Sequence, residues 1–480
     1  MKALNASTVE KPALPVKILQ FGEGNFLRAF VDWMIDKANQ AGKMNHGVAI
    51  VQPIAGGDFV RDLFAKQDNL YHVYLEGIKD KQPVKEVALV KCITGVYNPY
   101  SDYKTYESIF LSEELEMIVS NTTEAGIRYE EGDDLNAEPP ASFPAKMTAL
   151  LYKRFKKFNG DAARGLSIIC CELIEDNGST LRQYVLQHAA YNKLGADFEQ
   201  WVNSHCHFYD TLVDRIVPGF PKENIQEIQA EIGFEDNLVV KGEYFHVWAI
   251  GGDSSIKQKL PLDQAGLNVL FMDDIREFRA KKVRILNGSH TGMVPVALQL
   301  GCATVMDAFN TPEVEKFINK MVSDETLPVI NEDPEELKKF AGKILERFYN
   351  PYLKHYLKDI SLNSLSKWET RNFPTVKDNY TKLNKNARLN TFSFAALLVL
   401  YSGKSAVEFT PNDTPEFVEF IRNSFDATNV KGWVEAVVKN KKIWKEDFTV
   451  SPFFIDEVTG SVSAILNNGM KAALTELINA

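Results

Sequence analysis

The residues from Lys282 to His290, K-V-R-I-L-N-G-S-H, place a base, an amide donor and an imidazole in one short segment. The pattern predicts a helix, in which successive residues turn by about 100°. Lys282 then lies at 0°, His290 at about 80° and Asn287 at about 140°, spread along roughly 12 Å of helix axis. Such an arc can take a proton from an alcohol or give one to a ketone, provided that burial depresses the lysine pKa. Neighbouring Lys281, about 100° away, is expected to face solvent.

Length and composition bound the class of protein. A chain of 480 residues exceeds what one hydrophobic core usually supports, so two domains are expected. The net charge of -10, with no basic stripe or tail, argues against a nucleic-acid partner. No apolar run approaches the roughly 20 residues that span a bilayer, so no membrane association is expected. We expect instead a small-molecule substrate, bound by a monomer or weak oligomer.

The cysteines indicate a reducing compartment. Their number is odd, five in all, and the chain has neither a C-x-x-C motif nor a signal-peptide pattern. Reduced thiols and a cytoplasmic location are therefore expected. Cys170 and Cys171 close the apolar run L-S-I-I-C-C and are predicted to be buried strand residues rather than a redox pair. Cysteines and histidines do not cluster at zinc-site spacing, so no metal site is expected.

Short apolar runs alternate with helical patterns in the first half of the chain. The run 16–20 (V-K-I-L-Q) is followed by glycines, a helical pattern and a second run at 47–52 (G-V-A-I-V-Q). This order is typical of the opening unit of a doubly wound sheet. Residues 71–98 predict a hairpin or meander, and 116–120 and 166–172 predict further buried strands.

The second half of the chain is predicted to be helical. An acidic, proline-containing loop is expected at 130–144, and strand signals fade from about residue 270. The segments T-P-E-V-E-K-F-I-N-K-M and A-A-L-L-V-L-Y favour helices, the first with a Thr-Pro start. We therefore predict an α/β protein with a doubly wound sheet in a domain at 1–270 and a mostly helical domain at 271–480.

A glycine turn follows the first strand. Gly22-Glu23-Gly24-Asn25-Phe26-Leu27 supplies two glycines of the dinucleotide fingerprint, with Leu27 where the third is expected. Two glycines permit a tight turn and a close approach of pyrophosphate to a helix N-terminus. The alternative is an ordinary glycine turn, but the place between a strand and a helix favours a dinucleotide site. Gly22, Gly24, Asn25 and Phe26 are therefore assigned to the cofactor.

The end of the second strand bears on the choice of cofactor. Gln52-Pro53 stands where an acidic residue usually binds the ribose, and the nearest carboxylate is Asp58. No arginine or lysine stands there to bind a 2′-phosphate, so NAD is favoured over NADP. Gln52 is assigned to the cofactor, together with Asn121 and Thr122, which directly follow another strand candidate.

Three motifs resemble one enzyme family. The segment 208–218, F-Y-D-T-L-V-D-R-I-V-P, carries the V-D-R-I-x-P core of the mannitol dehydrogenase signature, although Cys206 departs from it. G-x-G-x-F-x-R at 22–28 resembles the nucleotide fingerprint of that family, and K-x4-N-x2-H at 282–290 resembles the catalytic motif of these metal-independent polyol dehydrogenases. The resemblance covers nearly the whole chain. It implies a Rossmann-type NAD-binding domain, a mostly helical C-terminal domain and a site in the cleft between them.

The resemblance also implies roles for single residues. The motif lysine is the general base, carried onto Lys282, and the motif asparagine, carried onto Asn287, stabilises the alkoxide. The motif histidine, carried onto His290, binds substrate, and Asp214 of the V-D-R-I core is also assigned to substrate. For an isolated helix the alternative would be a surface Lys282 and a core His290.

One departure narrows the substrate. The family carries Asp-Asn at a strand end that here reads C-E-L-I-E-D-N-G, so Leu173 replaces a second donor to the alkoxide. This form resembles the branch of the family that interconverts tagaturonate and altronate. Glu172 is expected to face the nicotinamide or the substrate hydroxyls, with a structural carboxylate as the alternative.

A second feature resembles the same branch. The segment 361–371, S-L-N-S-L-S-K-W-E-T-R, contains Lys367 and Arg371, which lie about 40° apart on a helix. Together they can hold a substrate carboxylate, with Arg371 bidentate, and an acidic protein that binds an anion needs such a cationic pair. An exposed basic helix face is the alternative.

The expected function is therefore NAD-dependent, reversible reduction of tagaturonate to altronate. The alternatives are a fructuronate reductase, a neutral polyol dehydrogenase and a non-catalytic nucleotide-binding protein. The cationic pair argues against a neutral polyol, and Leu173 argues against both other enzymes. The presence of Lys282 and Asn287 argues against a protein without catalytic activity.

Overall fold

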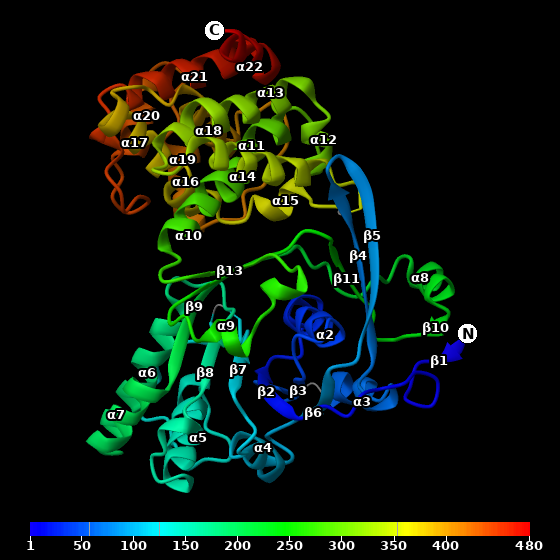
Figure 1. Cartoon of the computed structure of the whole chain (residues 1–480). Coiled ribbons are helices and arrows are strands. Elements are labelled where there is room, and N and C mark those ends of the chain that lie inside the picture. Colours follow the sequence, from blue (N-terminus) through cyan, green and yellow to red (C-terminus); the bar gives the residue numbers. More distant parts are fainter. Residues whose placement is uncertain (57, 124, 353) are drawn as a thin grey trace. The chain divides into compact units, whose positions relative to one another are not determined.

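The structure is a computed structural model that describes residues 1–56, 58–123, 125–352 and 354–480 (Figure 1). By their internal contacts the residues form two compact units. The first contains Met1–Gly77 and Pro83–Arg276, and the second contains Ile78–Gln82 and Glu277–Ala480.

The first unit is built on an eight-stranded sheet with the order β13-β12-β9-β8-β7-β2-β3-β6. The strands from β6 to β9 run parallel, β12 is antiparallel to β9, and β13 is parallel to β12. The predicted strands at 16–20, 47–52, 116–120 and 166–172 all lie in this sheet and are confirmed. The bounds of the eight strands are β2 (Val16–Phe21), β3 (Gly47–Val51), β6 (Ile93–Tyr97), β7 (Met117–Ser120), β8 (Ser167–Cys170), β9 (His207–Asp214), β12 (Val247–Gly251) and β13 (Val269–Met272).

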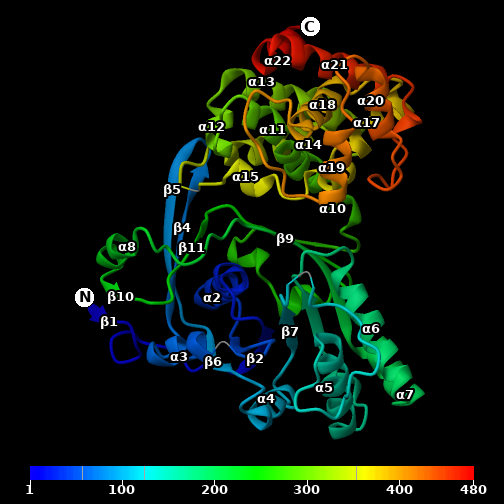
Figure 2. The ribbon, with the colours of Figure 1, turned by 180° about the vertical axis from the view of Figure 1, so that it is seen from behind.

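Helices cover both faces of this sheet. Because side chains alternate along a strand, Leu19 and Phe21 of β2 pack in one core and Ile18 packs in the other. Figures 1 and 2 show α5, α6 and α7 side by side, and these helices supply the core that contains Leu19. Burial on both faces confirms a doubly wound α/β sheet. The helices of this unit are α1 (Asn25–Leu27), α2 (Trp33–Gln40), α3 (Asp58–Lys66), α4 (Tyr103–Phe110), α5 (Phe143–Lys157), α6 (Asn177–Tyr191), α7 (Ala196–His205), α8 (Ile225–Ile232) and α9 (Ile256–Lys259).

The segment 71–98 forms a hairpin and not a meander. β4 (Tyr71–Lys79) pairs with β5 (Gln82–Val90) on one side and with β11 (Val240–Glu243) on the other, in a sheet of order β11-β4-β5. The turn residues Asp80 and Lys81 have φ of 52° and 61°, the left-handed pair that matches the twist of a two-residue hairpin. β6 instead pairs with β3 in the large sheet. A further small sheet joins β1 (Lys2–Ala3) and β10 (Phe234–Glu235).

Two further predictions about the first unit are confirmed. The loop predicted at 130–144 is present up to Ser142, and Phe143 and Pro144 already belong to α5. The side chain of Ser142 caps α5 by accepting from the Ala145 N–H at 3.2 Å. Cys170 and Cys171 are fully buried at the end of β8, and burial raises their thiol pKa values well above the ordinary value. Buried thiols with raised pKa values are unreactive, which agrees with the prediction of buried strand residues rather than a redox pair.

The second unit is helical and packs around α18, which is buried along nearly its whole length. The Thr-Pro segment begins α13 at Pro312, and A-A-L-L-V-L-Y lies within α18, so both helices are confirmed. Among the helices of the described ranges, none combines the length and apolar character needed to cross a bilayer. The helices are α10 (Arg276–Lys282), α11 (Gly288–Gln299), α12 (Val305–Phe309), α13 (Pro312–Lys320), α14 (Pro334–Glu346), α15 (Leu357–Ile360), α16 (Ser364–Arg371), α17 (Phe373–Leu383), α18 (Arg388–Ser402), α19 (Pro415–Asn423), α20 (Val430–Val438), α21 (Phe454–Asn468) and α22 (Met470–Asn479).

Helices of other types interrupt this pattern. Two π-helices coincide with sequence motifs, since η1 (Arg28–Asp32) follows the glycine turn and η4 (Val283–Asn287) separates Lys282 from His290. A third π-helix is η5 (Met321–Thr326). The short 3-10 helices are η2 (Ala162–Arg164), η3 (Asp263–Ala265), η6 (Leu327–Val329), η7 (Arg347–Tyr349) and η8 (Phe448–Val450).

Candidate active site

The helix that carries Lys282, Asn287 and His290 is not regular, which corrects the expected arc. Lys282 ends α10, Asn287 ends the π-helix η4, and His290 lies in the first turn of α11. A π turn joins residue i to i+5, so residues five apart come closer to one face than the 140° offset predicts. Lys282 and Asn287 are five apart. The irregular turn therefore favours a shared face for these two side chains.

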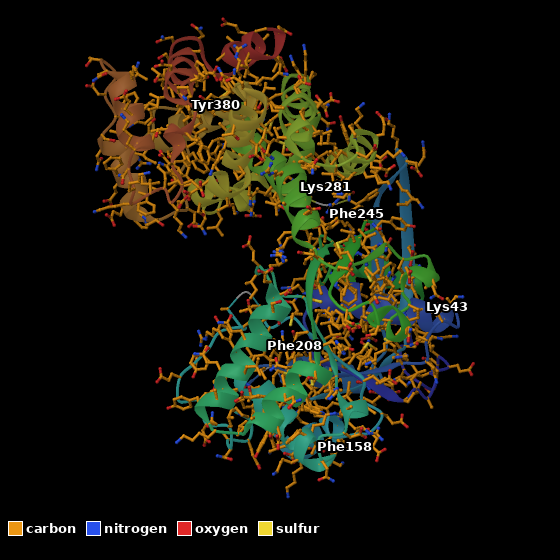
Figure 3. All side chains as sticks on the ribbon, turned by 60° about the vertical axis from the view of Figure 1, so that its left-hand side comes forward. Lys43, Phe158, Phe208, Phe245, Lys281 and Tyr380 are labelled. Carbon is orange, nitrogen blue, oxygen red and sulfur yellow. The ribbon has the colours of Figure 1, made fainter. Side chains whose placement is uncertain are left out.

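Lys281 does not face solvent, contrary to expectation. Its side chain is only 11% exposed, and its ammonium pairs with Glu332 at 2.6 Å. The same ammonium lies 4.8 Å from the ring centroid of Phe340. Figure 3 labels Lys281 on the ribbon of this helix. Its charge is thus committed to a structural contact within the second unit.

His290 is held in an aromatic setting that keeps it neutral. Its ring stacks on Phe348 at 4.5 Å and meets the edge of His355 at 5.1 Å. The residue is 8% exposed, and its Nε2 has no hydrogen-bond partner among the described residues. Burial is the largest cause that lowers the pKa of His290 well below its ordinary value. A neutral imidazole with an unpartnered nitrogen can bond a substrate hydroxyl.

Positive charges act on His290. Those of Arg347, Arg371 and Lys282 lower its pKa further, and the neighbouring His355 has the same effect. We call these four residues and His290 the His290 cluster. Burial, reinforced by the charge of Arg347, lowers the pKa of His355 as well. In a protein of net charge -10, such a cluster is suited to an anionic ligand.

Arg371 and Lys367, four residues apart in α16, bond different partners. The Arg371 Nη1 donates to the Thr291 hydroxyl at 3.3 Å, and burial lowers the pKa of the guanidinium. The Lys367 ammonium donates instead to the Ile360 carbonyl at 3.0 Å. The structure thus brings Arg371 to α11 and ties Lys367 to the end of α15.

The glycine turn of the first unit requires glycine at its first position. Gly22 has φ +125°, and a Cβ there would lie 3.1 Å from the Asn121 carbonyl oxygen. Gly24 has φ -66°, and a Cβ there would meet nothing within 4 Å. Gly22 thus shapes the turn, whereas Gly24 leaves open space where a pyrophosphate can approach.

Arg28 stabilises the glycine turn through hydrogen bonds, a role that the sequence motif alone did not predict. Its Nη2 donates to Asn25 Oδ1 at 2.6 Å, and its Nη1 donates to the Leu238 carbonyl at 2.8 Å. The guanidinium carbon lies 5.5 Å from the ring centroid of Tyr71. Asn25, assigned to the cofactor, therefore orders the turn through its side chain. Phe26 projects into a cavity described below.

Gln52 and Asp58 are both engaged at the end of β3. Gln52 is 1% exposed, and its Nε2 donates to the Gly56 carbonyl at 2.8 Å. Asp58 pairs with Arg61 at 2.8 Å and accepts from Asn98 Nδ2 at 2.9 Å. In the structure both side chains stabilise the loop after β3.

Glu172 fixes the ends of β7 and β8. Its Oε1 accepts from the Thr122 N–H and hydroxyl, both at 2.9 Å, and its Oε2 accepts from the Ser120 hydroxyl at 3.1 Å. The residue is 1% exposed, and burial raises its pKa. These contacts support the structural alternative for Glu172, and they direct Thr122 toward this carboxylate.

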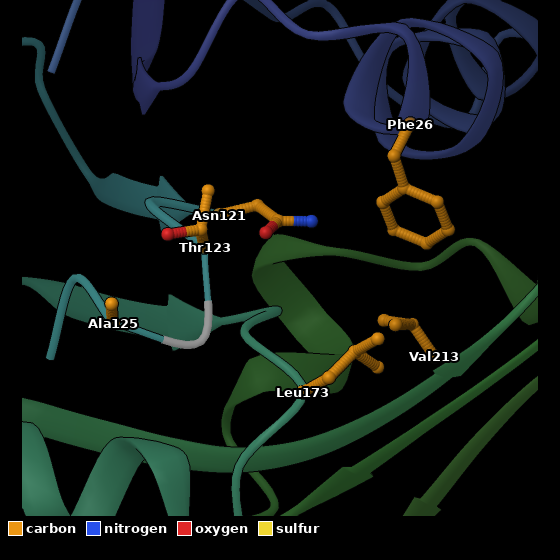
Figure 4. Close-up of a pocket in the computed structure, with 6 residues that line it drawn as sticks. All are labelled: Phe26, Asn121, Thr123, Ala125, Leu173 and Val213. Carbon is orange, nitrogen blue, oxygen red and sulfur yellow. The ribbon is translucent and has the colours of Figure 1, made fainter. Parts of the chain in front are cut away.

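A cavity of about 460 Å³ lies over this edge of the sheet (Figure 4). The Asn121 amide, the Phe26 ring and the Leu173 side chain extend into one space in Figure 4. Leu173 is 63% exposed, so its side chain is accessible from this space. The cavity is lined by Phe26, Asn121, Thr123, Ala125, Leu173 and Val213. Its apolar walls and single amide suit a flat aromatic ring with a polar substituent.

Asp214 and Arg215 of the V-D-R-I segment lie in different surroundings. Asp214 ends β9 and is 9% exposed, whereas the Arg215 guanidinium donates to the carbonyls of Ala29 and Phe245. Arg215 also lies over the Trp33 ring at 4.1 Å, and burial lowers its pKa to about 9. Arg215 therefore anchors the helix that follows the glycine turn.

Two family models match the chain in sequence. The mannitol dehydrogenase Rossmann domain matches residues 16–264, and the mannitol dehydrogenase C-terminal domain matches residues 274–466. Altronate oxidoreductase of Bacillus subtilis (strain 168) is 42% identical, over 96% of this chain and 95% of that protein. Altronate oxidoreductase of Bacteroides thetaiotaomicron is 40% identical, over 98% of both.

Solved structures share the fold over almost the full length. Pseudomonas fluorescens mannitol 2-dehydrogenase, in a ternary complex with NAD and D-mannitol, has a TM-score of 0.71 at 20% identity and covers 97% of this chain and 95% of its own. D-sorbitol dehydrogenase in substrate-free form has a TM-score of 0.83 at 18% identity, over 99% of this chain and 100% of its own. With the two family models and the relatives near 40% identity, they show that the chain belongs to the mannitol dehydrogenase family of oxidoreductases.

Proposed function

We propose that this protein catalyses the reversible, NAD-dependent reduction of tagaturonate to altronate. The observation that carries the proposal is the His290 cluster, in which Arg371 bonds the Thr291 hydroxyl beside the buried His290 imidazole. The charges of Arg347 and Lys282 act on the same imidazole and lower its pKa. A sugar acid offers one carboxylate and several hydroxyls to such a cluster. The relatives named altronate oxidoreductase support the same substrate class.

The first unit has the features that a dinucleotide needs. Gly24 leaves the turn open to pyrophosphate at the start of a helix, and the cavity at Phe26, Asn121 and Leu173 accommodates a nicotinamide. When bound, NADH supplies the hydride that reduces the ketone carbon. These residues hold and orient the ring, while the proton chemistry belongs to the second unit.

Lys282 supplies the proton. In the direction of reduction, its ammonium gives a proton to the ketone oxygen as the carbon gains hydride, and in oxidation the neutral amine takes the proton back. The Asn287 amide donates a hydrogen bond to the same oxygen and stabilises its developing negative charge. Because Leu173 offers no hydrogen bond, Asn287 carries more of this stabilisation than it would beside a second amide.

The remaining residues of the cluster orient the substrate. The unpartnered Nε2 of His290 bonds a hydroxyl, and Arg371 binds the carboxylate. Lys367 contributes less to this binding, since its ammonium is tied to the Ile360 carbonyl. We infer that Glu172 acts on the site indirectly, by holding Thr122 and Ser120 beside Asn121.

A panel of NADH oxidation assays tests the proposal. Tagaturonate, fructuronate and fructose are compared by kcat/KM at equal enzyme concentration. Tagaturonate is expected to be the best substrate by at least about tenfold, because fructose lacks the carboxylate and fructuronate differs in stereochemistry. A preference for fructuronate would assign the protein to that neighbouring activity, and comparable rates on fructose would refute a carboxylate site.

A further inference from the structure

A buried carboxylate stands at the start of a chain of polar contacts in the second unit. Glu325 of η5 is 5% exposed. Its Oε1 accepts from the Leu389 N–H at 2.6 Å, and its Oε2 accepts from the N–H and the Nδ2 of Asn390 at 2.9 and 2.8 Å. Since Leu389 and Asn390 lie in the first turn of α18, Glu325 caps this central helix and fixes the orientation of the Asn390 amide.

The chain continues to the helix of the His290 cluster. Asn372 Nδ2 donates to Asn390 Oδ1 and to the Gly288 carbonyl, both at 3.0 Å. Asn372 directly follows Arg371, and Gly288 directly follows Asn287. One buried amide thus joins the end of the π turn to the end of α16.

Gly292 allows this close approach. A Cβ there would lie 3.3 Å from Asn372 Nδ2, tighter than an ordinary van der Waals contact, and 2.9 Å from Met321 Cε, the end of a flexible side chain. A Cβ at Gly288 would lie 3.4 Å from the Arg371 carbonyl oxygen, an ordinary contact distance. A larger residue at Gly292 would therefore crowd the Asn372 amide. The spacing between the helix of Asn287 and the residue Arg371 therefore depends on this contact.

We propose that Asn372 is a positioning residue which, held by Asn390 and Glu325, fixes the Asn287 turn relative to Arg371. The proposal rests on the proposed function, because Asn287 and Arg371 take their roles from it. Asn372 acts through the Gly288 backbone and does not touch the substrate. A misplacement of about 1 Å at a reacting group can cost on the order of 100-fold in rate, so loss of the tie is expected to lower kcat.

Asn379 provides a matched control on the next helix. It is 1% exposed, against 2% for Asn372, and its Nδ2 donates to the carbonyls of Glu325 and Thr375 at 2.8 and 2.9 Å. Asn379→Leu therefore removes a buried amide of equal size whose bonds do not reach α11. Both leucine variants are expected to lower the thermal midpoint to a similar extent.

The kinetic comparison uses the full-length protein with NADH and the best substrate of the panel. Asn372→Leu is expected to lower kcat by about 10–100-fold and to leave the Kd for NADH, measured by fluorescence titration, unchanged. Asn379→Leu is expected to keep kcat within about threefold of the wild type. Equal kcat losses in the two variants, or a wild-type kcat in Asn372→Leu, would overturn the positioning role. If Asn372→Leu does not fold, Asn372→Ala is held to the same outcomes.

Hydrogen exchange separates this proposal from the proposed function. Amides of the segment 283–292 are expected to exchange faster in Asn372→Leu than in the wild type or in Asn379→Leu. This measurement needs no substrate, so it tests the Asn372–Gly288 contact even if the wild type reduces none of the sugars. Unchanged exchange in Asn372→Leu would contradict the proposal whatever the substrate proves to be.

Discussion

Arg371 donates a hydrogen bond to the Thr291 hydroxyl at 3.3 Å, and Thr291 is the neighbour of His290 in α11. This contact brings a guanidinium from α16 to the helix that carries His290. Lys367, one turn earlier in α16, donates to the Ile360 carbonyl instead. The two cations therefore have different hydrogen-bond partners, although their spacing in the sequence predicted one shared role in binding a carboxylate.

Replacing Arg371 is expected to weaken discrimination for sugar acids. Hydrogen bonds to charged groups contribute about 1.5–3 kcal/mol, so Arg371→Met should lower kcat/KM for tagaturonate by about 10–150-fold. Any weak rate on fructose should change far less. Lys367→Met is the matched control and should stay within about fivefold. If Lys367→Met proves the more damaging variant for tagaturonate, the carboxylate is bound elsewhere than we propose.

The two glycines of the turn should fail in different ways. Gly22→Ala forces an alanine to φ +125° beside the Asn121 carbonyl and should cost about 1–3 kcal/mol of unfolding free energy. Gly24→Ala meets no neighbour within 4 Å, so its stability should stay within about 0.5 kcal/mol of the wild type. Its Cβ should instead obstruct the pyrophosphate and raise the Kd for NADH. Urea unfolding and NADH titration of both variants measure these effects. Unchanged NADH affinity in Gly24→Ala would place the dinucleotide elsewhere.

Glu325 should make the stability of the protein depend on pH. Burial raises its pKa to about 7, against an ordinary value of 4.5, although N–H donors of Asn390 and Leu389 oppose the shift. A raised folded-state pKa means that the protonated form is favoured by folding. Its contribution is fully present below about pH 4.5 and is lost as the pH rises through about 7.

The variant Glu325→Gln isolates this effect because it cannot ionise. Its free energy of unfolding, relative to that of the wild type, should therefore rise between pH 5 and pH 8. Urea unfolding at several pH values gives the difference directly, since all other groups titrate equally in both proteins. Parallel pH profiles for the two proteins would show that Glu325 does not titrate in this range.

The sheet and the helices were predictable because their signals are local. The apolar run of β2, the glycines after it and the Thr-Pro start of α13 each depend on a few neighbouring residues. A hairpin within residues 71–98 was also among the predicted alternatives, but the pairing of β6 with β3 was not predicted. That pairing depends on strands more than forty residues apart, which periodicity does not encode.

The residue types of the candidate site could be proposed from the sequence, whereas its geometry could not. The five-residue spacing between Lys282 and Asn287 fits a π turn. The sequence was interpreted as a regular α-helix, so this turn was not predicted. The cavity joins Phe26, Leu173 and Val213, which come from three distant segments. No spacing rule relates such residues, since only the folded sheet brings them together.

Long-range partners decided the role of several charged residues. The sequence predicts a solvent-facing Lys281, whereas in the structure its ammonium contacts Glu332 and Phe340. The sequence leaves Glu172 as either a substrate-facing or a structural carboxylate. In the structure Thr122 and Ser120 donate hydrogen bonds to its two oxygens, which supports the structural role. Burial and partner identity are properties of the fold, so the sequence could offer only alternatives for these residues.

The most direct test of the account is the turnover of Lys282→Met with NADH and tagaturonate. Loss of the group that gives and takes the proton should lower kcat by about 100–10,000-fold, with NADH affinity unchanged. Lys281→Met is the control, since this lysine is committed to Glu332 and should retain kcat within about threefold. Near-normal turnover in Lys282→Met would contradict the mechanism, and an equal loss in Lys281→Met would show that the effect is structural.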